Sequence, residues 1–194
     1  MVEGRTFSGD DWYGEDLADV VFTDCVFDDV DFSEARTAGA VFTGCTFHTC
    51  RFNSSVHTDS AFVACEFRRC NFFDVTWSGC KVAGTSFAEC SVRPMSVEGG
   101  TWRGVVMRHL RMDKLDLAGL DLREADLSGS DLSLSVLAGA QLDGATVREA
   151  VLTGADLRGA SLVGVDLASA RLRGTKLDVA GAVLLAEQHG AVVD

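Results

Sequence analysis

The sequence lacks any apolar run approaching the roughly 20 residues that a membrane-spanning helix needs. Residues 1–10 are acidic and have no apolar signal-peptide core, so we expect a cytoplasmic protein. Basic residues are also scarce: 17 Lys and Arg stand against 29 Asp and Glu, for a net charge of −12. This balance argues against a nucleic-acid or anionic-membrane binder and favours partners with basic surfaces.

Signs of catalysis are missing as well. The four histidines, His48, His57, His109 and His189, occupy unrelated positions, and no Ser/His/Asp or Cys/His arrangement accompanies them. The phosphate-binding pattern GxxxxGK[ST] does not occur. We therefore predict a protein that is not an enzyme and that uses no cofactor or metal.

A five-residue period runs through the chain. It is clearest from Asp116 to Ala140, DLAGL DLREA DLSGS DLSLS VLAGA. The residue in second place of each pentad, here called position i, is leucine throughout this stretch. Position i is apolar almost everywhere from Phe7 to Leu177, over 35 pentads without an insertion. Most Phe and all three Trp lie at i in the first part, whereas Leu dominates after Leu117. Such a fixed period is the signature of a repeat architecture.

A period of five fits neither a helix nor a strand alone. It fits a short extended step followed by a turn, and Gly, frequent at i+2, supplies the positive φ that the second central residue of a type II turn needs. Four pentads then make one square coil, so residues 20 apart stack about 4.8 Å from one another. Positions i and i−2 point inward, and large residues at one are paired with small residues at the other.

With these features the chain resembles the pentapeptide-repeat family, whose consensus is A(D/N)LXX, over about nine tenths of its length. The resemblance implies an all-β solenoid, a right-handed quadrilateral β-helix of about nine coils with a C-terminal capping helix. We divide it into a Phe-rich half at residues 1–94, a Leu-rich half at 95–177, and a capping helix with a dimerisation tail at 178–194.

All seven cysteines lie at i−2. Two ladders result, one of Cys25, Cys45 and Cys65 and one of Cys50, Cys70 and Cys90. Parallel Cβ vectors do not converge into a disulfide, and thiols in line cannot surround a tetrahedral zinc ion. We interpret the cysteines as small buried hydrophobic residues in the reduced state.

A few positions interrupt the repeat. Thr37 and His57 occupy i positions, where their side chains would be buried. We predict that they hydrogen bond to one another in the core and do not form a functional polar site. Leu110, Leu115 and Leu120 are large residues at successive i−2 positions, so irregular coils are expected between residues 92 and 112. The single proline, Pro94, lies at i+2, where a cis bond defines a type VI turn; a cis Arg93–Pro94 bond and a kink are predicted.

After Leu177 the sequence predicts a helix from Val179 to His189, capped by Asp178 and closed by Gly190. Such a helix would cover the open backbone of the last coil. Leu184 and Leu185 offer more apolar surface than one coil needs, and in relatives this element joins two protomers end to end. The resemblance thus implies a homodimer; we assign its contacts to Val183, Leu184, Leu185 and Val192.

Charge is distributed unevenly: residues 1–50 carry net −9, residues 51–110 net +2 and residues 111–194 net −5. Two sets of carboxylates place one anion on each side of a coil. The first ring, at i+2, consists of Asp19, Asp24, Asp29 and Glu34. The second ring, at i−1, consists of Asp116, Asp121, Asp126 and Asp131. They either keep the rod soluble or imitate the phosphates of duplex DNA.

Two further segments, SVRPM at 91–95 and AEQHG at 186–190, are similar to the mycobacterial fluoroquinolone-resistance branch of the family. That resemblance implies a DNA mimic that binds DNA gyrase, competes with DNA, inhibits supercoiling and confers resistance to fluoroquinolones or another topoisomerase poison. The projecting loops of other quinolone-resistance relatives are missing here. The alternative hypothesis is a non-enzymatic scaffold or interaction rod with no topoisomerase target.

Overall fold

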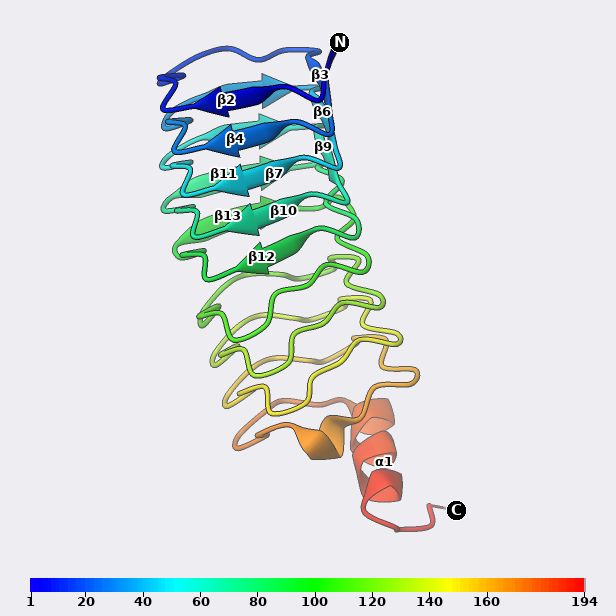
Figure 1. Ribbon diagram of the computed structural model, residues 1–194. Helices are drawn as coiled ribbons and strands as arrows, with labels where there is room; N and C mark the ends of the chain where they lie inside the picture. The colour runs from blue at the N-terminus through cyan, green and yellow to red at the C-terminus, as the bar shows by residue number, and fades with distance from the viewer. Residues whose placement is uncertain (194) are drawn as a thin grey trace.

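The computed structural model describes residues 1–193; the last residue of the predicted tail, residue 194, lies outside it. The chain forms a solenoid of stacked square coils closed by a C-terminal helix, with the two termini at opposite ends of the rod (Figure 1). Every recorded ladder is parallel and pairs residues 20 apart, as in Phe7 with Phe27 and Phe27 with Phe47. The predicted four-pentad coil is therefore confirmed.

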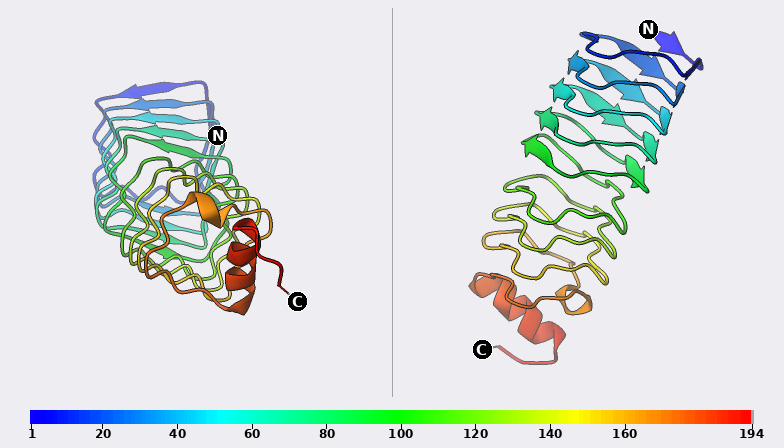
Figure 2. Two further views of the ribbon diagram at one scale, coloured as in Figure 1. Left: turned by 90° about the horizontal axis from the view of Figure 1, so that it is seen from below. Right: turned by 90° about the vertical axis from the view of Figure 1, so that its left-hand side faces the viewer.

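Three faces of the square carry strands of two to four residues, and the remaining face carries single bridges (Figures 1 and 2). We number the faces in chain order. The first face holds β1 (Val2–Glu3), β3 (Val21–Thr23), β6 (Val41–Thr43) and β9 (Ala61–Val63). The second holds β2 (Thr6–Ser8), β4 (Val26–Asp28), β7 (Thr46–His48), β10 (Glu66–Arg68) and β12 (Ser86–Ala88). The third has bridges only, beginning with Asp11 to Asp31, and the fourth holds β5 (Arg36–Ala38), β8 (Val56–Thr58), β11 (Val75–Ser78) and β13 (Met95–Glu98).

Regular strands span about five turns, as the five-stranded second face shows, and not the nine coils predicted. The difference arises because no strand follows β13 in the solenoid; from about residue 101 each side pairs through one residue only, as in Gln141 with Ser161. The 20-residue spacing continues through these bridges to the pair of Asp156 and Lys176. The stack therefore goes on with shorter pairing on each side.

Side chains at i and i−2 fill the interior. Phe47 is fully buried, and its ring stacks on those of Phe27 and Phe67 with centroid distances of 4.7 and 4.6 Å. Later coils replace this stack with leucines such as Leu132, also fully buried. Small residues occupy i−2, which lets large residues fill the same cross-section from i.

The corners are left-handed at i+2, as predicted. Glycine supplies the positive φ at many of them, but 16 other residues adopt it too, among them Asp24 with φ 50° and Ala64 with φ 52°. The Arg93–Pro94 bond is cis, the conformation that the position of the proline in its pentad predicts. Irregular pairing occurs between residues 92 and 112, also as predicted: no bridge joins Ser91 to Arg111 in the described chain, although Asn71 pairs with Ser91 and Arg111 with Asp131.

The end of the solenoid is closed by η1 (Leu167–Ser169) and α1 (Val179–Gln188). The Asp178 side chain accepts a hydrogen bond from the Gly181 amide at 2.9 Å, and Gly190 follows the helix with φ 85°, so the predicted cap is confirmed. Gly181 is buried against the last coils, and the Gln188 amide group donates to the Val165 carbonyl at 2.7 Å. No helix in the described chain is long and apolar enough to cross a membrane.

Candidate partner-binding surface

The first ring occupies four consecutive corners near the N-terminal end of the rod. Asp19, Asp24, Asp29 and Glu34 are all exposed, and all adopt left-handed φ values between 50° and 58°. A corner projects away from the rod axis, so each carboxylate is held out into solvent. The structure thus places the four predicted anions on four successive corners of the rod.

Glycines in the next coil leave room for two of these carboxylates. A methyl group at Gly39 would lie 2.7 Å from Asp19 Oδ1, a contact that only a shift of the carboxylate would relieve. At Gly44 a methyl group would collide with the Asp24 carboxylate in the same way. The carboxylates therefore lean along the rod over a backbone without side chains.

Few cations neutralise this end. Arg51 binds Asp29 at 3.2 Å and Asp31 at 3.1 Å, and His48 Nδ1 lies 2.8 Å from Asp28. Among residues 1–193, no ion pair forms at Asp19 or Asp24. The Glu34 carboxylate accepts a hydrogen bond from the phenol of Tyr13 and thereby raises the pKa of the Tyr13 phenol. Three of the four predicted anions are thus free of a cationic partner.

The second ring differs. Asp116, Asp121, Asp126 and Asp131 each accept a hydrogen bond from the amide two residues later, at 3.0 to 3.2 Å. This side-chain-to-backbone bond is an Asx turn, which shapes the corner. The side chains of Asp121 and Asp126 are only 12% and 18% exposed. Their position in the turn, and not only their charge, explains why aspartate occurs there.

Arginines neutralise half of the second ring. Arg123 donates to Asp121 through Nε and Nη2, both at 2.8 Å, and Thr101 adds a third bond at 3.0 Å. These contacts lower the pKa of Asp121 to about 2. Arg108, from the preceding coil, donates through Nε to Asp126 Oδ2 at 2.6 Å. The second ring is therefore a set of turn-forming and ion-paired carboxylates, a role that the repeat pattern did not reveal; the arginine two residues after Asp121 and Asp156 was the available signal.

The C-terminal end exposes apolar surface. Leu184 and Leu185 are only partly buried against the last coils, Val183 is half-buried, and Val192 is 87% exposed. Leu184 also lines a shallow groove of about 200 Å³ with Leu162 and Val163 between α1 and the solenoid. The four residues assigned to the dimer contact thus lie at one end of the rod, although part of the surface of Leu184 and Leu185 is buried against the last coil.

The interior shows how the cysteines and the polar core pair are satisfied. Each cysteine thiol points to a carbonyl 23 residues earlier, as in Cys50 to Phe27 at 3.3 Å and Cys80 to His57 at 3.2 Å. All seven are free thiols, six of them buried, and burial raises the pKa of Cys80 to about 11. Thr85 makes the same bond through its hydroxyl, at 2.7 Å to Phe62. Position i−2 therefore favours a small side chain with a donor.

The predicted pair of Thr37 and His57 is confirmed and has a third member. Ser55 donates to the Phe52 carbonyl at 2.7 Å, so its oxygen accepts from His57 Nε2 at 3.0 Å. His57 Nδ1 then accepts from the Thr37 hydroxyl at 2.9 Å. Complete burial lowers the pKa of His57 to about 3, which keeps the ring neutral. No group of three or more residues able to hold a metal ion occurs within residues 1–193.

Comparison with known families identifies the repeat. The family model "Pentapeptide repeats" matches eight copies, at residues 16–53, 116–154 and 148–178, which together cover more than half of the chain. The chain belongs to the pentapeptide-repeat family. A comparison with curated proteins finds no match.

Among solved structures, full-length QnrB1, a plasmid-mediated fluoroquinolone resistance protein, is similar to this pentapeptide-repeat protein with a TM-score of 0.63 and 22% identity. The match covers 97% of this chain and 99% of that one. A trypsin-treated form of QnrB1 gives a TM-score of 0.62 at 22% identity, over 100% of this chain and 97% of that one. At this identity the similarity shows a shared fold.

Proposed function

We propose that this pentapeptide-repeat protein is a DNA mimic that binds DNA gyrase, competes with DNA, inhibits supercoiling and protects the enzyme from fluoroquinolones or another topoisomerase poison. The first ring carries the proposal: exposed carboxylates on successive corners of a narrow rod, in a region of net −9, three of them without a cationic partner. A surface of this kind complements a basic DNA-binding groove. The fold shared with a fluoroquinolone resistance protein supports the choice of target.

The mechanism is electrostatic competition. Anions spaced along a rod are attracted to a saddle of Lys and Arg, which raises the association rate before close contact is made. Because exposed charges are screened within about 8 Å at physiological salt, binding should weaken steeply as salt rises. The second ring contributes less, because its carboxylates are already engaged with arginines and turn amides.

A homodimer through the C-terminal end completes the proposal. Val179 and Val163 are 81% and 75% exposed beside the groove under α1, and Val192 adds apolar surface to the same end. Two rods joined there would carry the first ring at each far tip. Sedimentation of the native protein and of Val179→Glu tests the contact: the native chain should sediment as a dimer and the variant as a monomer. A native monomer would contradict it.

Supercoiling inhibition by the purified protein is the central test. We expect inhibition by the native chain and at least tenfold weaker inhibition when the first ring is neutralised by Asp19→Asn, Asp24→Asn, Asp29→Asn and Glu34→Gln. Asparagine tolerates left-handed φ, so the corners should keep their shape. A matched control removes four other exposed charges without ion partners, through Glu98→Gln, Glu149→Gln, Asp166→Asn and Glu187→Gln.

The outcomes separate the two hypotheses. Inhibition lost by the ring variant and kept by the control supports the first ring as the gyrase-binding surface. Equal loss in both variants would mean that only net charge matters. No inhibition by native, folded protein at micromolar concentration would leave the scaffold hypothesis.

A further inference from the structure

Two adjacent faces of the rod lack backbone pairing at the same level within residues 1–193, and we call this gap the seam. It separates residues 90–98 from residues 110–118 on the third and fourth faces. On the third face, bridges join Asn71 to Ser91 and Arg111 to Asp131, but none within residues 1–193 joins Ser91 to Arg111. On the fourth face, β13 pairs with β11 and Asp116 with Val136, yet β13 has no partner in the next coil.

The seam leaves defined backbone groups without partners. In the coil before it, the Ser91 amide donates to Cys70 at 3.0 Å and the Phe72 amide donates to Ser91 at 2.8 Å. The equivalent bonds one coil later would join the Arg111 amide to Cys90 and the Val92 amide to Arg111. Neither forms in the described chain. Two facing edges therefore retain the donors and acceptors that an extended chain uses in a ladder.

Bulky side chains explain the seam. Leu110 occupies i−2 on the third face, where the preceding coils have cysteine, and Leu115 follows Met95 at i−2 on the fourth. All three side chains are buried, so three large residues lie where other coils place small ones. On the first face the neighbour of Leu120 is Gly100, and the bridge from Thr101 to Asp121 persists. The coils are thus held together on one side and apart on the other.

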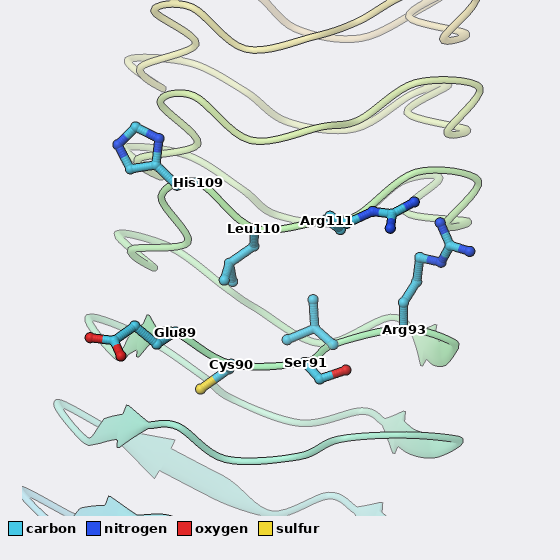
Figure 3. A pocket seen from close by; sticks show the side chains of 8 residues that line it. Glu89, Cys90, Ser91, Arg93, His109, Leu110 and Arg111 are labelled. Atoms are coloured by element: carbon cyan, nitrogen blue, oxygen red, sulfur yellow. The ribbon is translucent and has the colours of Figure 1, made fainter.

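A cavity of about 410 Å³ opens at the third-face part of the seam (Figure 3). Arg93 and Arg111 extend from opposite edges and bring their guanidinium groups together at one end, whereas Glu89 and His109 lie at the other end (Figure 3). Both arginines approach the single carboxylate of Asp113. Arg93 and Arg111 are the two arginines of the cavity lining, whereas its one carboxylate, Glu89, is already bound by Arg69 at 2.9 Å, so the lining itself is cationic. Hydrogen bonding by Ser133 and the charge of both arginines lower the pKa of Asp131, which lies outside the lining.

We propose that the seam binds an extended, acidic peptide segment of a partner protein by strand addition. The segment's main chain would hydrogen bond to the open edge at Arg111 or Val92, and one of its carboxylates would pair with Arg93 and Arg111. In strand addition generally, main-chain hydrogen bonds supply affinity and contacts with alternate side chains supply specificity. Charge complementarity selects an acidic segment over a basic one.

A labelled probe peptide tests the proposal: eight residues of alternating Val and Glu, compared with the same peptide carrying Lys in place of Glu. We expect fluorescence anisotropy to show binding of the acidic peptide to the full-length protein, and at least tenfold weaker binding of the basic one. Arg111→Glu should weaken binding of the acidic peptide at least tenfold. Arg171→Glu is the matched control, because Arg171 has the same position in the pentad on the same face, but its edge is paired with Val151; it should change binding less than twofold.

Hydrogen exchange gives an independent readout. In the free protein the Arg111 amide should exchange faster than the Asp131 amide, which donates to Leu110 at 2.9 Å. The acidic peptide should slow exchange at Arg111 and leave Asp131 unchanged. Leu110→Cys, which restores the residue of the preceding coils, should slow the exchange of free Arg111 and reduce binding.

Three results would overturn the proposal: no binding of the acidic peptide at several hundred micromolar, equal binding of the basic peptide, or binding without protection of the Arg111 amide. A variant that fails to fold is recognised by circular dichroism. In that case Arg111→Gln, which removes the positive charge without introducing a negative one, replaces Arg111→Glu.

Discussion

The Phe-rich and Leu-rich halves of the rod keep the same 20-residue register with different local structure. In the first half, three faces form strands, and the corners that follow them, such as that after Phe27, lack a closing hydrogen bond in the described chain. In the second half, corners are closed by a bond from i+3 to i, such as Ala125 to Leu122 at 3.1 Å. Closing the corner shortens the extended step to a single bridge.

The residue at i−1 contributes to the difference. Several strands of the first half carry Val or Thr there, as at Val26, Val41 and Thr46, and β-branched residues favour extended backbone. In the second half, however, Val136 and Val151 precede corners that are closed. Closed corners often carry Asp or Asn, whose side chain accepts a bond from the amide at i+1, as Asp31 does on the third face of the first half. The Asx turn and the closed corner thus occur together in both halves.

Truncating the core should distinguish the halves most strongly. Phe47→Ala removes a ring stacked on two others and should lower the free energy of unfolding by about 4–5 kcal/mol. Leu132→Ala, at an equally buried position, should cost about 3 kcal/mol because no ring stack is lost. Guanidinium unfolding followed by circular dichroism measures both. An equal or larger loss in Leu132→Ala would mean that the aromatic stack adds nothing beyond buried area.

Acid should destabilise the Phe-rich half through His57. Its pKa is about 3 in the folded chain and near 6.5 when unfolded, so the unfolded state binds the extra proton below pH 6.5. The free energy of unfolding is therefore unaffected by His57 above pH 6.5 and falls as pH drops toward 3. At pH 4.5 it is lower by about 3 kcal/mol. Because carboxylates titrate as well, the native chain is compared with Thr37→Val/His57→Phe. The stability difference between the two should shift by this amount between pH 7 and 4.5; a constant difference would contradict a neutral buried imidazole.

Much of this architecture could be predicted from sequence, because it depends on which way a residue points. The period alone determines the coil, the inward positions, the left-handed corners and the pairing of Thr37 with His57. Partners of many outward side chains depend instead on residues 18 to 22 positions away, as Arg108 with Asp126 and Arg51 with Asp29, although Arg123 and Asp121 are only two residues apart. For that reason the two acidic rings looked equivalent in the sequence. The strand content was also missed, since it depends on whether a hydrogen bond closes each corner, which the period leaves open.

The two rings should separate stability from binding. Asp121→Asn breaks charge-assisted bonds to Arg123 and should lower the free energy of unfolding by about 1–2 kcal/mol, with little effect on the proposed inhibition of gyrase. Because the folded pKa of Asp121 is depressed to about 2, its contribution is present above about pH 3.8 and disappears as pH falls to 2. Asp24→Asn should change stability by less than about 0.5 kcal/mol and weaken inhibition. Thermal unfolding and supercoiling assays on both variants check this; a reversed pattern would move the binding surface to the second ring.

The smallest expected effect concerns the corners. Ala64 holds φ 52° in the same column as Gly44, and a Cβ in the left-handed region is strained. Ala64→Gly should therefore raise the free energy of unfolding by about 0.5–1 kcal/mol, even though glycine has more conformational freedom to lose on folding. In the Leu-rich half, Gly144 forms a left-handed corner with φ 69°, and an added Cβ would lie 3.6 Å from the Glu124 side chain. Gly144→Ala should therefore produce the opposite change of similar size. If both substitutions destabilise the chain, the alanine corner is held without strain, and the positive φ there is a consequence of the stacked coils alone.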